Sequence, residues 1–254
     1  MNNQKKLKVI VVMPAYNAEK TLEKTYKDIP HDIVDEVIVV DDESHDNTVE
    51  TAKKLNLEVF VHKKNLGYGG NQKTCYAKAL ERGGDVIVMI HPDYQYDATK
   101  TKEMITPILD GTVDIMLGSR IRSRAEALAG GMPLYKYVSN RFLTLIENVA
   151  LGLNLSEYHT GFRAFRREVL EVVPFQEFSD DFVFDQDILV SAHSFGFRMG
   201  ETPVPVRYFP EASSINFKRS AWYGLSIFWT LGLYYGHKLG LLKSKLFVSN
   251  KKSS

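Results

Sequence analysis

The sequence predicts an α/β fold in which a mostly parallel sheet is flanked by helices. Short, continuous runs of β-branched apolar residues recur along the first half of the 254-residue chain, a pattern typical of strands buried on both faces. Segments with helical spacing and polar faces alternate with these runs. Polar, turn-forming residues follow four of the runs, which predicts a ligand-binding crevice at the carboxyl edge of the sheet.

The predicted strands and helices alternate as far as residue 120. The expected strands span 9–13, 37–40, 59–61, 86–90 and 115–117. The expected helices between them span 18–28, 48–54, 71–81 and 98–110. Because a helix follows each of the first strands, this half is expected to form βαβ units and an open sheet.

The second half is less regular. Residues 121–140 are rich in Arg, Gly and Ala, which predicts a mobile loop that covers the crevice as a lid. A helix is expected over 142–151, a loop over 158–163 and a second helix over 185–194.

The composition is that of an ordinary globular protein. Lysine and arginine number 32, aspartate and glutamate 31, and 44% of the residues are hydrophobic, which excludes disordered, collagen-like and disulfide-stapled chains. The net charge of +1 argues against a nucleic-acid-binding protein, but residues 207–254 carry +7 and the remainder −6. A basic tail predicts contact with an anionic surface, a bilayer ahead of DNA, and a simply solvated tail is the alternative.

The single cysteine and the N-terminus bear on the cellular compartment. Cys75 has no partner for a disulfide, so a packing role on a helix is expected. The first apolar run stops at Pro14, and no small-residue cleavage site accompanies it. We therefore expect a buried strand rather than a signal peptide, and a cytoplasmic protein.

An uncharged, strongly aromatic stretch covers residues 221–236. As a helix it would reach about 24 Å, short of the roughly 30 Å hydrocarbon core of a bilayer. Trp222 and Trp229 stand near a lysine-rich tail, which favours peripheral contact with a membrane or a contact in a homo-oligomer. Core packing is the alternative.

A glycine-rich motif, GYGGNQKT at 67–74, follows a strand and opens a helix. Gln72 stands where both the dinucleotide-binding fingerprint and the P-loop require glycine, so neither phosphate motif is expected. The positive end of the helix, together with Lys73, could still assist a phosphate.

Two adjacent acids, Asp41 and Asp42, end the second strand. Carboxylates accept charge-assisted hydrogen bonds from sugar hydroxyls and ring N–H groups, so the pair could bind a ribose or a base. Capping of a helix is the alternative, although Asp46 and Asn47 suit the cap of the next helix better.

Three polar residues, His91, Asp93 and Gln95, alternate just past the fourth strand. An extended backbone puts alternate side chains on one face, so carboxylate and amide oxygens could share one divalent cation. Mg²⁺ or Mn²⁺ held there would bridge to a substrate diphosphate. An ordinary turn is the alternative.

Seven short motifs follow one another along the chain: PAYNAE, VVDDESHDNT, NLGYGGN, HPDYQ, GSR, TGFRAFRREVL and FVFDQD. Together they resemble the family 2 glycosyltransferases of GT-A fold, and most closely the branch of dolichyl-phosphate mannose synthase and other polyprenyl-phosphate sugar transferases. The resemblance covers about residues 7–210. It implies a catalytic domain over 1–212, followed over 213–254 by an aromatic helical segment and a basic tail.

The resemblance also implies roles for particular residues. The positions that hold the base and ribose of a nucleotide sugar are Pro14, Ala15, Tyr16, Glu19, Asp41 and Asp42. Asp93 matches the metal-ligating aspartate of the DxD-type motif and Gln95 the neighbouring ligand, while Asp185 and Asp187 fall in the acidic motif that faces the sugar.

The acceptor side is implied in the same way. Arg120, Lys136 and Ser139 match positions near the acceptor phosphate in the lipid-phosphate branch, and Arg207 resembles a phosphate-binding arginine beyond the sheet. The chain departs from the family at His91, where the metal motif begins with an acid, because imidazole can ligate Mn²⁺ but brings no negative charge. It also has one marginal segment where lipid-phosphate transferases often carry transmembrane helices.

The expected reaction is an inverting transfer of a sugar from a UDP- or GDP-linked donor to a polyprenyl phosphate, with the metal and arginines stabilising the departing diphosphate. A phosphate acceptor is ionised near neutral pH and needs no strong base. The alternative acceptor is a saccharide hydroxyl, for which Asp185 or Asp187 would be the base. A nucleotide-sugar-binding protein without turnover is the second alternative, suggested by His91.

Overall fold

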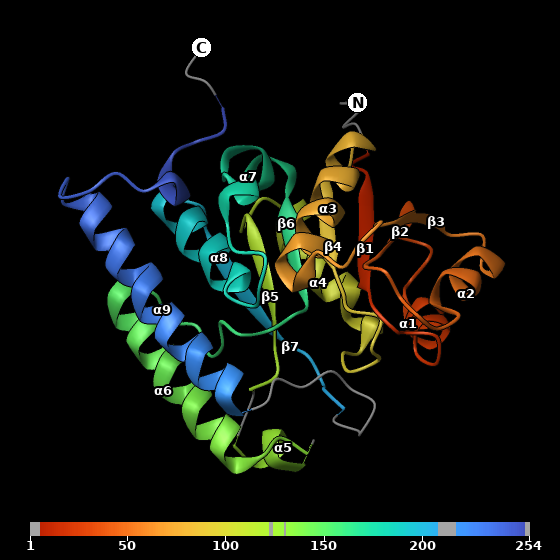
Figure 1. The fold of residues 1–254 in the computed structure, drawn as a ribbon, viewed down its shortest axis with the longest axis horizontal. Helices are drawn as coiled ribbons and strands as arrows, with labels where there is room; N and C mark the ends of the chain where they lie inside the picture. The colour runs from red at the N-terminus through yellow and green to blue at the C-terminus, as the bar shows by residue number, and fades with distance from the viewer. Residues whose placement is uncertain (1–5, 122–123, 130, 208–216, 252–254) are drawn as a thin grey trace.

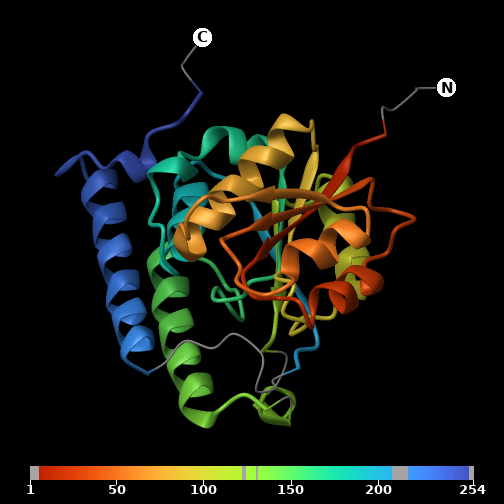
Figure 2. The same cartoon turned by 45° about the vertical axis from the view of Figure 1, so that its right-hand side comes forward.

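The computed structural model describes residues 6–121, 124–129, 131–207 and 217–251, and it contains a seven-stranded mixed sheet between two layers of helices (Figures 1 and 2). The strands are β1 (Val9–Ala15), β2 (Glu36–Asp41), β3 (Glu58–Val61), β4 (Val86–Met89), β5 (Ile115–Ser119), β6 (Arg163–Arg166) and β7 (Met199–Pro203). Their order across the sheet is β3-β2-β1-β4-β6-β5-β7. The α/β fold with a mostly parallel sheet is thus confirmed.

Strand β6 is the antiparallel strand of this sheet. It pairs antiparallel with both β4 and β5, whereas the other pairings among the described strands are parallel. The parallel register places Ala15 of β1 opposite Asp41 of β2. The carboxyl ends of β1, β2 and β4 therefore meet at one edge, as the sequence predicts.

The helices form two layers with an outer pair beside one of them. They are α1 (Leu22–Asp28), α2 (Thr48–Lys54), α3 (Gly67–Glu81), α4 (Thr101–Leu109), α5 (Arg124–Ala129), α6 (Leu134–Leu151), α7 (Arg167–Val172), α8 (Phe184–Ser194) and α9 (Phe217–Lys238), with short 3₁₀ helices at Ala98–Lys100, Phe175–Glu177 and Lys245–Phe247. Helices α1, α2 and α4 share one core with the sheet, and α3, α7 and α8 share the other. Helices α6 and α9 run side by side beyond α8 (Figure 1).

Alternate residues of the central strands supply the two cores. Val9, Val11 and Met13 of β1 pack on the side of α1 and α4, whereas Ile10 and Val12 pack on the side of α3 and α8. Both faces of the strand are buried, which explains why the strand has a continuous apolar sequence. Cys75 is buried as a free thiol on α3, in the packing role expected for it.

Several predicted boundaries change in the structure. Helix α1 begins at Leu22 instead of residue 18, and α3 begins at Gly67 instead of residue 71. Strands β6 and β7 were not predicted, because β6 has arginines at both ends and β7 contains Gly200 and ends in proline. These short strands lack the apolar run that marks the others, and pairing with their neighbours defines them instead.

The prediction of a loop over 121–140 is wrong, because most of the described residues in this range are helical. Helix α5 occupies Arg124–Ala129, and α6 begins at Leu134, immediately after Pro133. Pro133 is the residue before the helix, with φ −60° and an extended ψ of 139°, so the helical conformation starts only after it. Residues 122, 123 and 130 of the predicted lid lie outside the described residues, as does the predicted domain boundary at 212.

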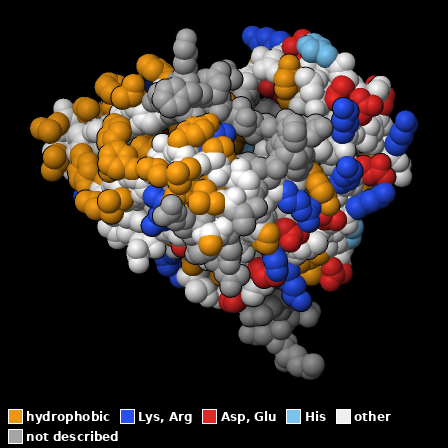
Figure 3. Space-filling view, turned by 90° about the horizontal axis from the view of Figure 1, so that it is seen from below, with side chains coloured by type: hydrophobic (Ala, Val, Ile, Leu, Met, Phe, Trp, Pro, Cys, Tyr) orange, Lys and Arg blue, Asp and Glu red, His pale blue; other side chains and the backbone are white. Residues whose placement is uncertain are grey.

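The outer surface of α6 and α9 is rich in apolar side chains (Figure 3). Within the described ranges, no helix combines the length and the hydropathy that a membrane crossing requires. Helix α9 is attached to the body through Asp187 of α8, whose carboxylate accepts hydrogen bonds from the Thr230 hydroxyl at 2.8 Å and the Ser179 amide at 3.2 Å. Burial raises the pKa of Asp187 to about 6.

This carboxyl group makes stability depend on pH in a defined direction. Between the usual pKa of 3.8 and about 6, the folded state binds a proton that the unfolded state has released, so stability falls as the pH rises through this interval. Asp187→Asn cannot ionise and retains an acceptor for Thr230. The difference in free energy of unfolding between the variant and the parent should therefore increase by up to about 3 kcal/mol, in favour of the variant, as the pH rises from about 4 to 6. Above about pH 6 this difference should stay constant. Urea unfolding at a series of pH values measures this.

The control is Val61→Ala, which changes an exposed side chain of β3 that cannot ionise. Its difference from the parent should stay constant across the same interval. A constant difference for Asp187→Asn as well would contradict the assignment of the buried carboxyl.

Candidate functional site

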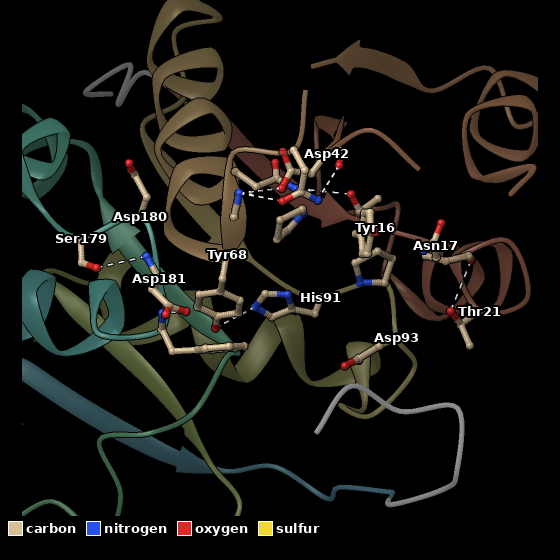
Figure 4. A pocket seen from close by; sticks show the side chains of 18 residues that line it. Tyr16, Asn17, Thr21, Asp42, Tyr68, His91, Asp93, Ser179, Asp180 and Asp181 are labelled. Atoms are coloured by element: carbon tan, nitrogen blue, oxygen red, sulfur yellow. Dashed lines mark hydrogen bonds between the residues drawn. The ribbon is translucent and has the colours of Figure 1, made fainter. Parts of the chain in front are cut away.

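A cavity of about 640 Å³ opens at the carboxyl ends of β1, β2 and β4. Four segments line it, at 14–18, 65–71, 91–93 and 179–182, with Thr21 and Asp42 between them (Figure 4). Its volume lies in the range of small-molecule sites. Three of the segments follow strands of the sheet, so the crevice lies where the sequence predicts it.

Asp42 and Asp41 have different surroundings. The buried carboxylate of Asp42 accepts hydrogen bonds from the amides of Leu66 at 2.8 Å and Gly67 at 3.0 Å, and it lies 2.7 Å from Nδ1 of His62. Asp42 therefore caps α3. Capping was the alternative role predicted for this residue, but for the helix that begins at Thr48. Asp41 accepts from the Ser44 amide at 3.0 Å and does not line the cavity, and its Oδ1 is buried without a hydrogen-bond partner among the described residues.

The glycines at the start of α3 allow the 179–182 loop to approach the helix closely. The Gly69 amide donates to the carbonyl of Asp180 at 2.7 Å. A Cβ atom on Gly69 would overlap the carbonyl oxygen of Ser179 and lie 2.9 Å from Cβ of Phe184. Gly67 has a φ of +83°, which L side chains rarely adopt. The glycine motif therefore serves packing between backbones.

Lys73 secures the same loop. Its Nζ donates to Oδ1 of Asp180 at 2.6 Å and to the carbonyl of Phe178 at 2.5 Å, and the side chain does not line the cavity. Hydrogen bonds to Asp42 and Asp180 occupy four backbone amides at the start of α3, so a phosphate at this helix end would have to displace them.

His91 and Tyr68 form one wall of the cavity (Figure 4). The Tyr68 hydroxyl donates to Oδ2 of Asp185 at 2.8 Å and lies 3.2 Å from Nε2 of His91. Burial lowers the pKa of His91, so the ring is neutral at pH 7. Because the Tyr68 proton is given to Asp185, His91 donates from Nε2 and keeps its lone pair on Nδ1.

Asp185 lies behind this wall, outside the lining. Its Oδ1 accepts from Nε2 of Gln72 at 3.0 Å and lies 2.9 Å from Nη1 of the fully buried Arg163. Asp187 is likewise outside the lining, bound to Thr230. The structure therefore places neither predicted acid at the cavity surface.

The predicted metal ligands are only partly brought together. His91 and Asp93 line the cavity, whereas Gln95 is buried outside the lining and its backbone N–H donates to Oδ1 of Asp93 at 3.0 Å. Among the described residues, no three His, Cys, Asp or Glu side chains are grouped as a metal site would require. Asp93 with His91 still fits a cation whose remaining ligands come from a substrate, as Mg²⁺ commonly binds.

The predicted acceptor residues lie on other elements. The guanidinium of Arg120 donates through Nε to Oε1 of the buried Glu157 at 2.8 Å. Partial burial and the charge of Arg120 lower the pKa of Lys136, on the first turn of α6, and Ser139 is exposed one turn later. Arg207 stacks over the Tyr94 ring at 4.8 Å.

The nucleotide-binding residues divide in the same way. Pro14, Ala15 and Tyr16 line the cavity, and Tyr16 is 51% exposed there. Glu19 lies outside the lining and accepts from the side chain of Asn47 at 2.9 Å.

Sequence reasoning missed the 179–182 loop and Tyr68. The loop has the sequence SDDF, and two consecutive acids ahead of a helix were the signal that was overlooked. Tyr68 lies between two glycines of the GYGGNQKT motif, and no sequence pattern marks it as part of a site. The partner of Arg120, Glu157, was missed as well, since it lies 37 residues away in the chain.

Comparisons with known proteins agree with this architecture. A sequence model of the family described as Glycosyl transferase family 2 matches residues 10–173. The UDP-N-acetylglucosamine–dolichyl-phosphate N-acetylglucosaminyltransferase of Methanococcus voltae is 29% identical over 217 residues, which are 79% of this chain and 86% of that protein. A hexosyltransferase of low-salt glycan biosynthesis from Haloferax volcanii is 30% identical, over 81% of this chain and 49% of that protein.

Solved structures share the fold at lower identity. Glucosyl-3-phosphoglycerate synthase from Mycobacterium tuberculosis in complex with UDP superposes with a TM-score of 0.69 at 20% identity, covering 94% of this chain and 82% of that chain. A complex of the same synthase with Mn²⁺, UDP and glucosyl-3-phosphoglycerate gives a TM-score of 0.68 at 19% identity, with the same coverage.

The close approach at Gly69 is testable by one added methyl group. Gly69→Ala would push the 179–182 loop away from α3, and we expect a loss of about 1–3 kcal/mol in free energy of unfolding. Gly232→Ala is the matched control, because it also lies within a helix but has open space around the added atom. The control should be neutral or stabilised by up to about 1 kcal/mol. Equal stability of both variants in thermal unfolding would show that the loop does not depend on this contact.

Proposed function

The chain belongs to glycosyl transferase family 2, and from this premise we propose that it transfers a sugar, with inversion, from a UDP- or GDP-linked donor to a polyprenyl phosphate. The enzyme is a glycosyltransferase, and the choice of donor, acceptor and stereochemistry is the proposal. Its support comes from the charge of the cavity, the surroundings of Arg120 and Lys136, and the relatives.

The charge of the cavity is the observation that carries the donor assignment. The described lining includes Asp42, Asp93, Asp180 and Asp181 and contains neither lysine nor arginine, and of these acids Asp180 is paired with Lys73 behind the lining. Such a lining would repel a nucleoside diphosphate unless a divalent cation entered with it. This argues for a metal-bound donor, and the UDP and Mn²⁺ in the synthase structures support the same choice.

Bound Mg²⁺ or Mn²⁺ would supply the positive charge that stabilises the departing diphosphate. We propose Asp93 as its protein ligand, with the Nδ1 lone pair of His91 beside it. Tyr68 would fix the orientation of His91, since a ligating histidine commonly donates a hydrogen bond from its second ring N–H to a neighbouring acceptor. Pro14, Ala15 and Tyr16 would position the base and ribose from the other side of the cavity.

The acceptor is proposed to be a phosphate because Lys136 offers a positive charge for it, whereas the candidate bases are engaged inside the protein. Lys136 has no hydrogen-bond or ion-pair partner within the described ranges, and its pKa is lowered, so a phosphate would relieve an uncompensated charge. The carboxylates of Asp185 and Asp187, which a hydroxyl acceptor would need as bases, are bound inside the protein. The name of the Methanococcus voltae relative, which includes dolichyl phosphate, supports the same acceptor.

In the proposed reaction an oxygen of the ionised acceptor phosphate attacks the anomeric carbon from the side opposite the diphosphate. The new carbon–oxygen bond forms as the bond to the diphosphate breaks, and no proton needs to move. Arg120 and Lys136 would orient the acceptor. Because a polyprenyl phosphate is anchored in a bilayer, we propose that the enzyme works at the cytoplasmic surface of a membrane.

The direct test is transfer from a panel of labelled UDP- and GDP-sugars, with Mg²⁺ or Mn²⁺, into solvent-extractable product. Label that depends on added polyprenyl phosphate would support the proposal. Label confined to water-soluble saccharide would replace it with the hydroxyl acceptor. Donor binding without transfer or hydrolysis would indicate a nucleotide-sugar-binding protein.

Asp93→Ala should lower metal-dependent transfer by about 100-fold or more, because the diphosphate would lose the protein ligand of its cation. The fold should be unaffected, as judged by thermal unfolding. Asp110→Ala, at the exposed residue that follows α4, is the control and should retain activity. Full activity of Asp93→Ala would refute the assigned metal position.

Lys136→Gln should raise the KM for polyprenyl phosphate about tenfold, the effect of losing one charge-assisted contact, and change kcat less. Lys102→Gln, on the exposed side of α4, is the matched control. Steady-state kinetics with varied acceptor measure both. An unchanged KM in Lys136→Gln would remove this lysine from the acceptor site.

A further inference from the structure

Helix α6 exposes a regular apolar stripe. Tyr135, Val138, Phe142, Leu145 and Val149 are spaced alternately three and four residues apart, so they lie on one side of the helix. Their exposed fractions run from 49% to 75%. A stripe of this length on the outside of a helix is unusual for a surface that faces only water.

Helix α9 carries a second such surface beside it. Trp222, Leu225, Phe228 and Trp229 are exposed, the two tryptophans by 69% and 70%. The opposite side of α9 packs into the core through Ile227, Leu231 and Tyr234. The helix is therefore apolar on both sides, which indicates that its outer side is covered by something apolar.

The two helices form one surface. The Tyr235 hydroxyl of α9 donates to the carbonyl of Ala150 on α6 at 2.5 Å, and Gly224 lies against Leu143. Figure 3 shows the apolar side chains gathered on the side of the molecule where α6 and α9 lie (Figure 1). We call this surface the α6–α9 face.

The charges around the face are basic. Helix α6 has Lys136 and Arg141, and its one acid, Glu147, is fully buried beside His159. The sequence of α9 contains no acid and ends in Lys238, and Lys243 follows it. Tryptophan and tyrosine beside lysine is the composition of surfaces that lie in the headgroup region of an anionic membrane.

We propose that the α6–α9 face docks on an anionic lipid bilayer. A two-fold dimer through the same face would bring two basic surfaces together, whereas anionic headgroups complement the basic residues. The proposal rests on the proposed function in one respect. The first turn of α6 carries Lys136, near Arg120, so a docked enzyme would present its acceptor cations close to the bilayer that holds the lipid phosphate.

The chain carries its own probe of this face, because Trp222 and Trp229 are its two tryptophans. Vesicles of phosphatidylcholine with phosphatidylglycerol should shift tryptophan emission of the intact protein to the blue, and lipids brominated in their acyl chains should quench it. Both effects should weaken in phosphatidylcholine alone and at high salt. The absence of a shift and of quenching would overturn the proposal.

Substitutions on α6 test whether both helices form the docking surface. Phe142→Ser with Leu145→Ser should lower partitioning onto the mixed vesicles at least about tenfold while both tryptophans remain. The matched control is Val61→Ser with Leu109→Ser, which removes exposed apolar side chains from β3 and α4. Sedimentation shows whether each variant is folded and monomeric. A dimer that the α6 variant dissociates, without vesicle binding, would identify a second copy as the occupant and overturn the proposal.

These vesicles contain no polyprenyl phosphate and no sugar donor. Vesicle binding therefore tests the docking surface independently of the transfer reaction. Docking without transfer activity would support the α6–α9 face and count against the proposed function. Lipid-dependent transfer without vesicle binding would support the proposed function and overturn the proposal that the α6–α9 face docks on a bilayer.

Discussion

A buried ion pair between Arg163 and Asp185 holds together the elements that surround the cavity. Arg163 is fully buried on the antiparallel strand β6, and its guanidinium lies 2.9 Å from Asp185 at the start of α8. Its Nε also donates to the carbonyl of Thr160 at 2.7 Å. Loss of either partner would leave an uncompensated charge in the interior, at a cost of about 3–5 kcal/mol. Strand β6, α8 and the loop that precedes β6 are therefore constrained to meet at this point.

The cavity wall follows from that constraint. Asp185 receives hydrogen bonds from Tyr68 and Gln72 on α3, so the ion pair also fixes the first turns of that helix. Tyr68 in turn orients His91. The chain before α8 crosses α3 at Gly69, where a side chain would leave no room. The glycines, the acids and the histidine of the motifs thus serve one assembly, in which backbone contact and carboxylate hydrogen bonds set the shape of the site.

The charges of the molecule are separated in space according to their partners. The cavity is lined by carboxylates, which suit a cation-bound diphosphate, whereas the exposed charges that the structure describes on α6 and at the end of α9 are lysine and arginine. A net charge of +1 conceals this separation. An acidic cavity beside a basic, apolar face is consistent with an enzyme that takes a soluble anionic donor on one side and an anionic lipid on the other.

The sequence by itself determined the five predicted strands, their parallel direction and the edge at which the cavity opens, because burial within the sheet leaves a local record in continuous β-branched runs. Strand β3 lies at the edge of the sheet and is partly exposed, so the prediction that it is buried on both faces is wrong. It also identified the family, since seven motifs keep their order along the chain. Only the tertiary structure decided what several motif residues do. Asp42 caps a helix that starts 25 residues later, Lys73 holds a loop 107 residues away, and Asp185 faces an arginine of β6 in place of the cavity. Such roles depend on contacts between distant segments, and neither periodicity nor spacing records which distant group a side chain will meet.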